Sequence, residues 1–189
     1  AVTGNLTVTA ATAAGWLSLT PVEDNNPPTS TVNFPVGDNR ANGVTVPIGP
    51  GGILAVVYNG PAAGNTTHAI FDVTGYFLPD LTGATYVKLT PNRLLDSRIA
   101  NGFSGPLVQG VSRSFQVTGR NLGNANLNVP SNAIAVTGNL TVTLATQAGW
   151  VSITPNLDNS PGTSTLNFPA GDNRANGVTA PLGTGGILS

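Results

Sequence analysis

The 189-residue chain contains no cysteine and no methionine, and its only histidine, lysine and glutamate are His68, Lys88 and Glu23. Without cysteine, the chain cannot form a disulfide framework or a thiolate metal site. Because the first residue is alanine rather than methionine, we expect a mature or internal fragment of a longer product.

Charge is also scarce. Charged residues make up 8% of the chain, against about 25% in ordinary soluble domains. The formal net charge is −1 and no basic run is present, so neither nucleic acid nor a membrane is an expected partner. No apolar run approaches the ~20 residues that a membrane span needs. Threonine, serine, asparagine and glycine must therefore supply most of the surface.

The chain repeats itself with a period of 134 residues. Residues 1–9 return unchanged as 135–143, and the same offset continues without a gap, so that 135–189 repeats 1–55. Self-similarity at a fixed period indicates a tandem array of structural units. We refer to 1–55 as the first repeat and to 135–189 as the second repeat.

This repetition predicts how the chain is organised. We expect 1–79 to be the C-terminal part of one unit, 80–85 to be a linker, and 86–189 to be the N-terminal and middle part of the next unit. The chain is therefore expected to begin inside one unit and to end inside another.

The pattern of apolar residues predicts an all-β fold. Apolar and polar residues alternate from Val2 to Val8, the period of a half-buried strand, and no stretch has a useful helical stripe. Turn signals such as Gly37-Asp38-Asn39 and Asn42-Gly43 separate the runs. Short strands with such turns between them indicate a β-sandwich, of jelly-roll or immunoglobulin-like type. The expected strands are 2–8, 16–20, 30–34, 44–48, 53–58, 68–77, 86–89, 94–95 and 114–117.

Differences between the two repeats separate buried from exposed positions. Leu17 becomes Val151, an exchange that a packed core tolerates, whereas Glu23 becomes Leu157. We therefore expect Leu17 to be buried and Glu23 to lie in an exposed loop.

Several motifs together resemble a known family of repeats. They are Asp72 to Phe77, Pro91 to Arg98, Gly149 to Pro155, Ser164 to Phe168 and Ala175 to Thr179. The chain resembles, over essentially its whole length, the repeat of about 130 residues found in large secreted and cell-surface bacterial proteins. That family's repeat opens with Pro-x-Arg-hydrophobic-Leu-Asp-Thr/Ser-Arg and ends with Gly-Tyr-Phe/Tyr. The resemblance implies an extracellular β-sandwich module without a catalytic role.

The few charges are concentrated at short spacings. A guanidinium held by a carboxylate can satisfy backbone carbonyls and fix a turn, so structural ion pairs are expected, with a polar ligand site as the alternative. The residues are Asp38, Arg40, Arg93, Asp96, Arg98, Asp172 and Arg174.

Trp16 and Trp150 occupy equivalent positions at the start of a predicted strand. A tryptophan there is usually a core residue between sheets, but an exposed pair would form a stacking platform for a sugar.

No cofactor is required by any motif. Oxygen atoms of Asp24, Asn25, Asp38, Asn39 and Asp158 could bind calcium, but no EF-hand loop is present and turn formation explains these residues equally well.

The only histidine does not complete a catalytic motif. His68 and Asp72 would share one face of a strand, but no Gly-x-Ser-x-Gly elbow accompanies them. We therefore expect a hydrogen-bonded strand histidine and no enzymatic activity.

The polar side of the first predicted strand is a row of hydroxyls and amides without charge. An ordinary solvated sheet face is the default expectation, and contact with a neighbouring unit, a lattice or attached sugar is the alternative. The residues of this candidate assembly face are Thr3, Asn5, Thr7 and Thr9, with Thr137, Asn139, Thr141 and Thr143 in the second repeat.

These observations favour a structural module of an extracellular filament, stalk or sheath, whose partners are copies of itself or adjacent repeats. Missing strands of one unit would be supplied by its neighbour. The alternative is an adhesion module that binds polysaccharide.

Overall fold

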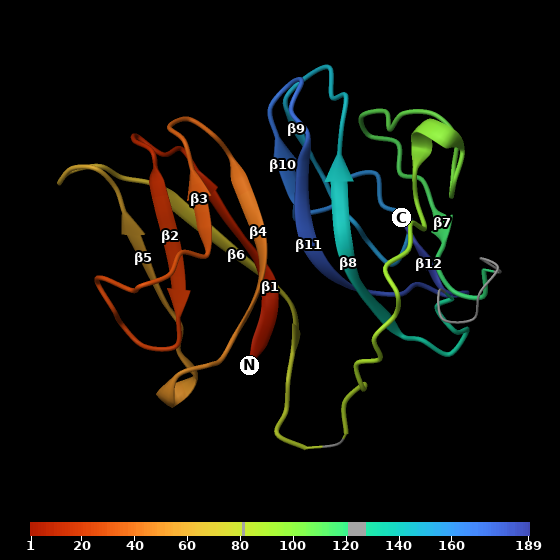
Figure 1. Cartoon of the computed structure of the whole chain (residues 1–189), viewed down its shortest axis with the longest axis horizontal. Helices are drawn as coiled ribbons and strands as arrows, with labels where there is room; N and C mark the ends of the chain where they lie inside the picture. The colour runs from red at the N-terminus through yellow and green to blue at the C-terminus, as the bar shows by residue number, and fades with distance from the viewer. Residues whose placement is uncertain (81, 121–127) are drawn as a thin grey trace. The chain divides into compact units, whose positions relative to one another are not determined.

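The computed structural model describes residues 1–80, 82–120 and 128–189. Within these residues the chain forms twelve strands and two short 3-10 helices, so the prediction of an all-β fold is confirmed (Figure 1). None of the helices in these ranges is long and apolar enough to cross a membrane. The elements are β1 (Val2–Thr9), β2 (Gly15–Thr20), β3 (Val32–Phe34), β4 (Arg40–Val46), η1 (Pro50–Gly52), β5 (Ala55–Asn59), β6 (His68–Tyr76), η2 (Ser97–Ile99), β7 (Phe115–Gln116), β8 (Ala135–Val142), β9 (Gly149–Val151), β10 (Leu166–Phe168), β11 (Arg174–Pro181) and β12 (Ile187–Leu188).

The chain divides into two compact units. Both the predicted division and the observed one break the chain after Pro79, but two segments of the second repeat belong to the same unit as the first repeat. Residue 81 of the predicted linker lies outside the described residues. The first unit consists of Ala1–Pro79, Thr137–Val151 and Thr163–Thr179, and the second of Asp80–Val136, Ser152–Gly162 and Ala180–Ser189.

Strand β1 is the centre of a three-stranded antiparallel sheet with the order β4-β1-β6. Leu6 lies opposite Asn42 on β4 and opposite Phe71 on β6. Strand β1 has a hydrogen-bonded neighbour on each side, and its residues Leu6 and Val8 are 1% and 0% exposed.

A second antiparallel sheet has the order β3-β2-β5. The buried cluster of the first unit takes side chains from both sheets, and burying each of the larger ones stabilises the fold by about 1.5–3 kcal/mol. The rings of Phe34 and Tyr58 stack at the edge of this cluster with centroids 5.8 Å apart. The cluster consists of Leu6, Val8, Ala11, Leu17, Val32 and Phe34.

Strands of the second repeat pair with one another as the equivalent strands of the first repeat do. Strand β8 pairs with β11 as β1 pairs with β4, and β9 pairs with β10 as β2 pairs with β3. Trp16 lies opposite Asn33, and Trp150 lies opposite Asn167. Since β8 has one neighbour among the described strands rather than two, its apolar residues are only half-buried.

The residue differences between the two repeats predicted correctly which positions are buried. Leu17 is 1% exposed, while Leu157, the counterpart of Glu23, is 64% exposed. Both observations confirm that the first position is internal and the second lies on the surface.

Three local predictions are wrong. Neither 86–89 nor 94–95 forms a strand, and Tyr86 and Val87 are 76% and 74% exposed because no strand of the described residues pairs with them. The predicted turn at Asn42-Gly43 lies inside β4. The second unit does contain a strand pair, formed by β7 and β12, in which Leu188 lies opposite Phe115.

Candidate functional site

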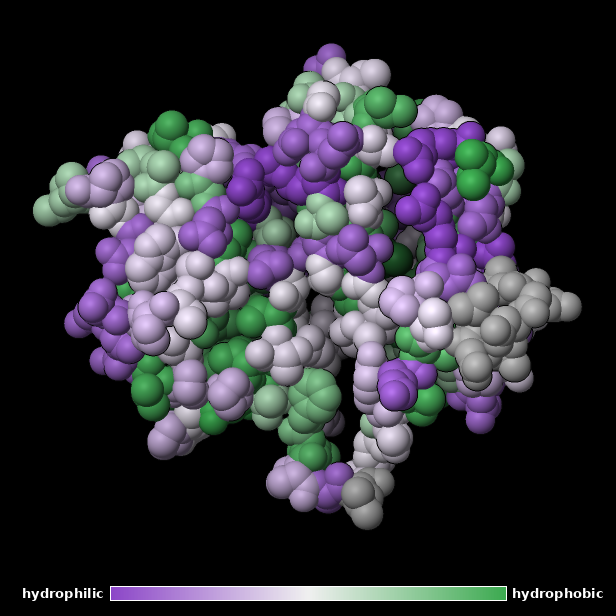
Figure 2. Space-filling view, in the orientation of Figure 1, coloured by the Kyte–Doolittle hydropathy of each residue, from purple (hydrophilic) through white to green (hydrophobic). Residues whose placement is uncertain are grey.

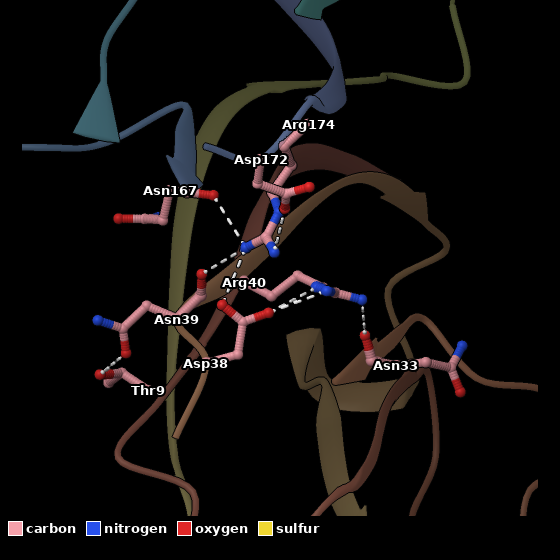
Figure 3. Close-up of polar contacts among 8 residues, drawn as sticks. All are labelled: Thr9, Asn33, Asp38, Asn39, Arg40, Asn167, Asp172 and Arg174. Carbon is pink, nitrogen blue, oxygen red and sulfur yellow. Dashed lines mark hydrogen bonds and ion pairs between the residues drawn. The ribbon is translucent and has the colours of Figure 1, made fainter. Parts of the chain in front are cut away.

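Asp38 brings together guanidinium groups from both repeats of the first unit. It follows a turn at Gly37 (φ 73°) and precedes β4, and its side chain is 11% exposed. Arg174 donates from NH1 to its Oδ1 at 3.0 Å, and Arg40 lies 2.9 Å from its Oδ2 through NH2 (Figure 3). Charge-assisted bonds of this kind are roughly twice as strong as neutral ones, so this carboxylate joins the repeats firmly.

Arg174, the first residue of β11, has its charge well compensated. Its side chain is 10% exposed, and NH2 lies 2.7 Å from Asp172 Oδ2. NH1 also donates to the backbone oxygens of Asn39 at 3.2 Å and Asn167 at 3.3 Å (Figure 3). A buried guanidinium is tolerated only when it is paired and hydrogen-bonded in this way.

Asn176 is the most deeply buried polar residue of the contact, at 2% exposure. Its Nδ2 donates to Asn5 Oδ1 at 2.8 Å, and its Oδ1 accepts from the backbone N of Gly43 at 2.6 Å. Asn5 in turn donates from Nδ2 to the backbone oxygen of Ser164 at 2.9 Å. The two asparagines therefore satisfy one another and the adjacent backbone, which removes the cost of burying them.

Gly43 permits a close backbone approach between the repeats. A Cβ atom at Gly43 would lie 2.1 Å from the carbonyl oxygen of Gly177, a distance that no side chain can occupy. Glycine within a strand often marks such an approach, and this requirement explains the presence of a glycine inside β4.

The expectation of an ordinary solvated face is wrong for the polar side of β1. Thr3, Asn5 and Thr7 are 9%, 7% and 5% exposed. The physical reason at Asn5 is the second repeat, which places Ser164 and Asn176 over its amide. Thr9, at the end of the strand, donates to Asn39 Oδ1 at 2.6 Å (Figure 3).

The corresponding side of β8 is open. Thr137, Asn139 and Thr141 are exposed, and Thr143 is half-buried with a hydrogen bond to Asn173 Oδ1. Asn139 donates from Nδ2 to Thr141 Oγ1 at 3.3 Å.

In the second unit, Asp96 fixes a turn with two arginines. Its carboxylate is 2.9 Å from Arg93 NH1 and 2.7 Å from Arg98 NH2, and it caps η2 by accepting from Arg98 N at 3.2 Å. The hydrogen bond from the Arg98 side chain, aided by the other arginine bonds, holds the pKa of Asp96 well below its usual range. The same hydrogen bond raises the pKa of Arg98.

Sequence reasoning missed Arg120, which belongs to this turn. Its guanidinium donates to the backbone oxygen of Leu94 and, at 2.6 Å, to Asn101 Oδ1. The scarcity of charged residues was the available signal, because in a chain with so few charges each arginine is a candidate for a specific hydrogen bond or ion pair.

The two tryptophans are not part of the buried cluster. Trp150 on β9 is 49% exposed, and Trp16 on β2 is half-buried. The first unit also has an open hollow of about 470 Å³, which is lined mostly by polar residues and by no aromatic residue. It is lined by Thr31, Val32, Asn33, Arg40, Ala41, Asn42, Asp172, Asn173, Arg174 and Ala175.

The remaining candidates lie in ordinary turns and strands. Asp24 accepts from Asn26 N and Asp158 from Ser160 N, each at 2.8 Å, as expected for turn residues. The described part of the chain contains no group of three or more histidine, aspartate or glutamate side chains able to hold a metal. His68 is exposed at the start of β6.

Comparison of the chain with protein-family models, with curated proteins and with solved structures gave no match. The assignment of a role therefore depends on the contact between the repeats.

Proposed function

We propose that this chain is a structural repeat module of an extracellular bacterial filament, stalk or sheath, in which successive units hold one another by polar and β-strand contacts. The observation that carries the proposal is the contact centred on Asp38 and Asn176. It joins different parts of the two repeats through charged and amide hydrogen bonds between side chains that are at most 11% exposed.

The proposed unit is a β-sandwich of jelly-roll or immunoglobulin-like type that recurs every 134 residues. Two features support it: sheets β4-β1-β6 and β3-β2-β5 share one buried cluster, and local contacts recur at that spacing. Gly49 N donates to Ile53 O, and Gly183 N donates to Ile187 O, each at 3.0 Å. A Cβ atom at either glycine would lie 1.7 Å from a proline carbonyl oxygen.

Among the described strands β8 pairs only with β11, and its other edge supports strand addition between units. A Cβ atom at Gly4 on β1 would lie 2.4 Å from Asp72 O on β6, whereas at the equivalent Gly138 on β8 it would meet nothing within 4 Å. Pairing of β8 with a β6-like strand of a successive unit would fill this space and satisfy backbone groups along the edge.

The surface composition fits close assembly of like units. Colours of intermediate and hydrophilic hydropathy cover much of the face in Figure 2, and strongly hydrophobic residues are interspersed among them. With so few charges in the chain, neighbouring units repel one another little, and threonine and asparagine can form hydrogen bonds between them.

The proposed extracellular location and the proposed kinship with secreted bacterial repeats depend on the motifs such as Pro91 to Arg98. Electron microscopy of the native material tests the function directly. We expect filaments or sheaths with a repeat along their length, and native material found only as dispersed monomers would contradict the proposal.

The alternative function, binding of polysaccharide, is favoured by one observation, the 49% exposure of Trp150. A sugar that stacks on this indole would change its fluorescence. Titration of the chain and of a Trp150→Ala variant with soluble cell-wall polysaccharide distinguishes the two functions. A saturable change that disappears in the variant would establish the alternative.

A further inference from the structure

The contact between the repeats joins two different surfaces. The sheet surface, in the first repeat, is formed by Asn5, Asp38 and Gly43. The edge surface, in the second repeat, is formed by Ser164, Arg174 and Asn176. Because one surface binds a different one, the contact is heterologous and is not closed by a twofold axis.

Each repeat carries both surfaces. The sheet surface recurs in the second repeat as Asn139, Asp172 and Gly177. The edge surface recurs in the first repeat as Ser30, Arg40 and Asn42. All six residues are of the same type as their counterparts, so the chain contains one filled pair of surfaces and one further pair.

The second pair of surfaces is accessible. The Asp172 side chain is 39% exposed against 11% for Asp38, and that of Arg40 is 35% exposed against 10% for Arg174. A Cβ atom at Gly177 would meet nothing within 4 Å.

The exposed edge surface already has the conformation of the bound one. Asn42 and Asn176 both donate from Nδ2 to the carbonyl oxygen eleven residues earlier, at 2.7 and 2.6 Å. Arg40 and Arg174 both donate from NH1 to the carbonyl oxygen seven residues earlier, at 3.1 and 3.3 Å. Binding therefore requires little rearrangement of these side chains, which reduces its entropic cost.

We propose that the sheet surface of the second repeat binds the edge surface of the first repeat in another molecule of this chain, so that molecules associate head to tail. In this contact Arg40 of one molecule pairs with Asp172 of the other, and Asn42 binds Asn139. The carbonyl oxygen of Gly43, the counterpart of the Gly177 carbonyl in the filled contact, approaches Gly177 of the other molecule. The inference rests on the proposed structural function, and it specifies which residues carry the assembly.

The key variant is Gly177→Ala. Its methyl group occupies open space within its own molecule, but in the contact it would lie against the carbonyl oxygen of an incoming Gly43, as the internal distance of 2.1 Å requires. We expect the variant to fold normally and to remain monomeric. Gly162→Ala is the matched control, because it also adds a methyl group where nothing lies within 4 Å but is outside both surfaces.

The second variant is Asn42→Ala, which removes the edge surface. Asn42 is exposed in the single molecule, so its loss affects the contact more than the fold. We expect association about tenfold weaker or more, because the facing polar groups lose their partners on burial.

Mixing the variants tests the direction of association. Gly177→Ala retains its edge surface and Asn42→Ala retains its sheet surface, so the mixture can form one intact contact and no second one. Sedimentation velocity of the parent, the two variants, the control and the mixture, from about 1 µM to about 1 mM chain, measures the result. Circular dichroism and thermal unfolding establish that each variant is folded.

The expected result is concentration-dependent assembly of the parent and of Gly162→Ala, monomers for Gly177→Ala, and dimers for the mixture. A parent that stays monomeric throughout, or a Gly177→Ala variant that assembles like the parent, would overturn the proposed contact. Closed rings that Gly177→Ala abolishes would support the contact and contradict the filament function. Filaments that persist in Gly177→Ala would support the filament function and overturn the contact.

Discussion

Replacing Asn176 by alanine tests whether the amide cluster holds the two repeats together. In the parent its side chain is 2% exposed and joins Asn5 Oδ1 at 2.8 Å and Gly43 N at 2.6 Å. Removing it leaves two buried polar groups without this partner, and each such loss costs about 1–3 kcal/mol. We therefore expect the free energy of unfolding of the first unit to fall by about 2–6 kcal/mol.

The chain offers both a probe and a control for this measurement. Trp16 and Trp150 lie in the first unit, so urea unfolding followed by tryptophan fluorescence reports on that unit alone. Asn42→Ala changes the same residue type at the equivalent but exposed position, and we expect a loss below about 1 kcal/mol. Equal midpoints for the Asn176 and Asn42 variants would refute the stabilising role of the amide cluster.

Three further predictions follow from burial, spacing and charge. Gly43→Ala should lower the urea midpoint of the first unit, because its methyl would lie 2.1 Å from the facing glycine carbonyl; an unchanged midpoint would exclude the close approach. Leu6→Ala should destabilise the first unit by about 2–5 kcal/mol and Leu140→Ala by clearly less, since only Leu6 is fully buried; urea unfolding compares them, and equal losses would contradict their different burial. The pKa of Asp96 is lower in the folded chain than in the unfolded one, so its stabilisation is complete above about pH 4 and is lost as pH falls further. The protection factors of the turn amides against hydrogen exchange, which are corrected for the intrinsic effect of pH, should fall at acid pH in the parent and not in Asp96→Asn, and identical profiles would contradict the role of Asp96.

The strands of the first unit could be predicted because side chains alternate across a sheet with a period of two. That pattern placed β1 and β2 correctly and identified Leu17 as internal. The prediction failed for 86–89, because no strand of the described residues pairs with this segment. A strand is stable only with a partner, and pairing between distant segments is not contained in a local pattern.

The contact between the repeats was harder to predict than the fold. Alternation marks one side of β1 as polar, but it does not reveal whether water or another polar surface covers that side. The physical signals were residues unsuited to a solvated strand, namely Asn5 in its middle and Gly43 beside it on β4. Their cost within a strand is offset only by a specific partner, and Asn176 and Gly177 provide it.

The same nine-residue strand sequence occurs twice in this chain, and among the described strands only one of the two segments has a neighbour on both sides. During folding, 135–143 competes with 1–9 for the position between β4 and β6, because both present identical side chains to these neighbours. The length and composition of the connection between them, rather than any side-chain contact, must decide which segment enters first. An arrangement in which 135–143 occupies the position between β4 and β6 is therefore an expected competitor of the native one during refolding.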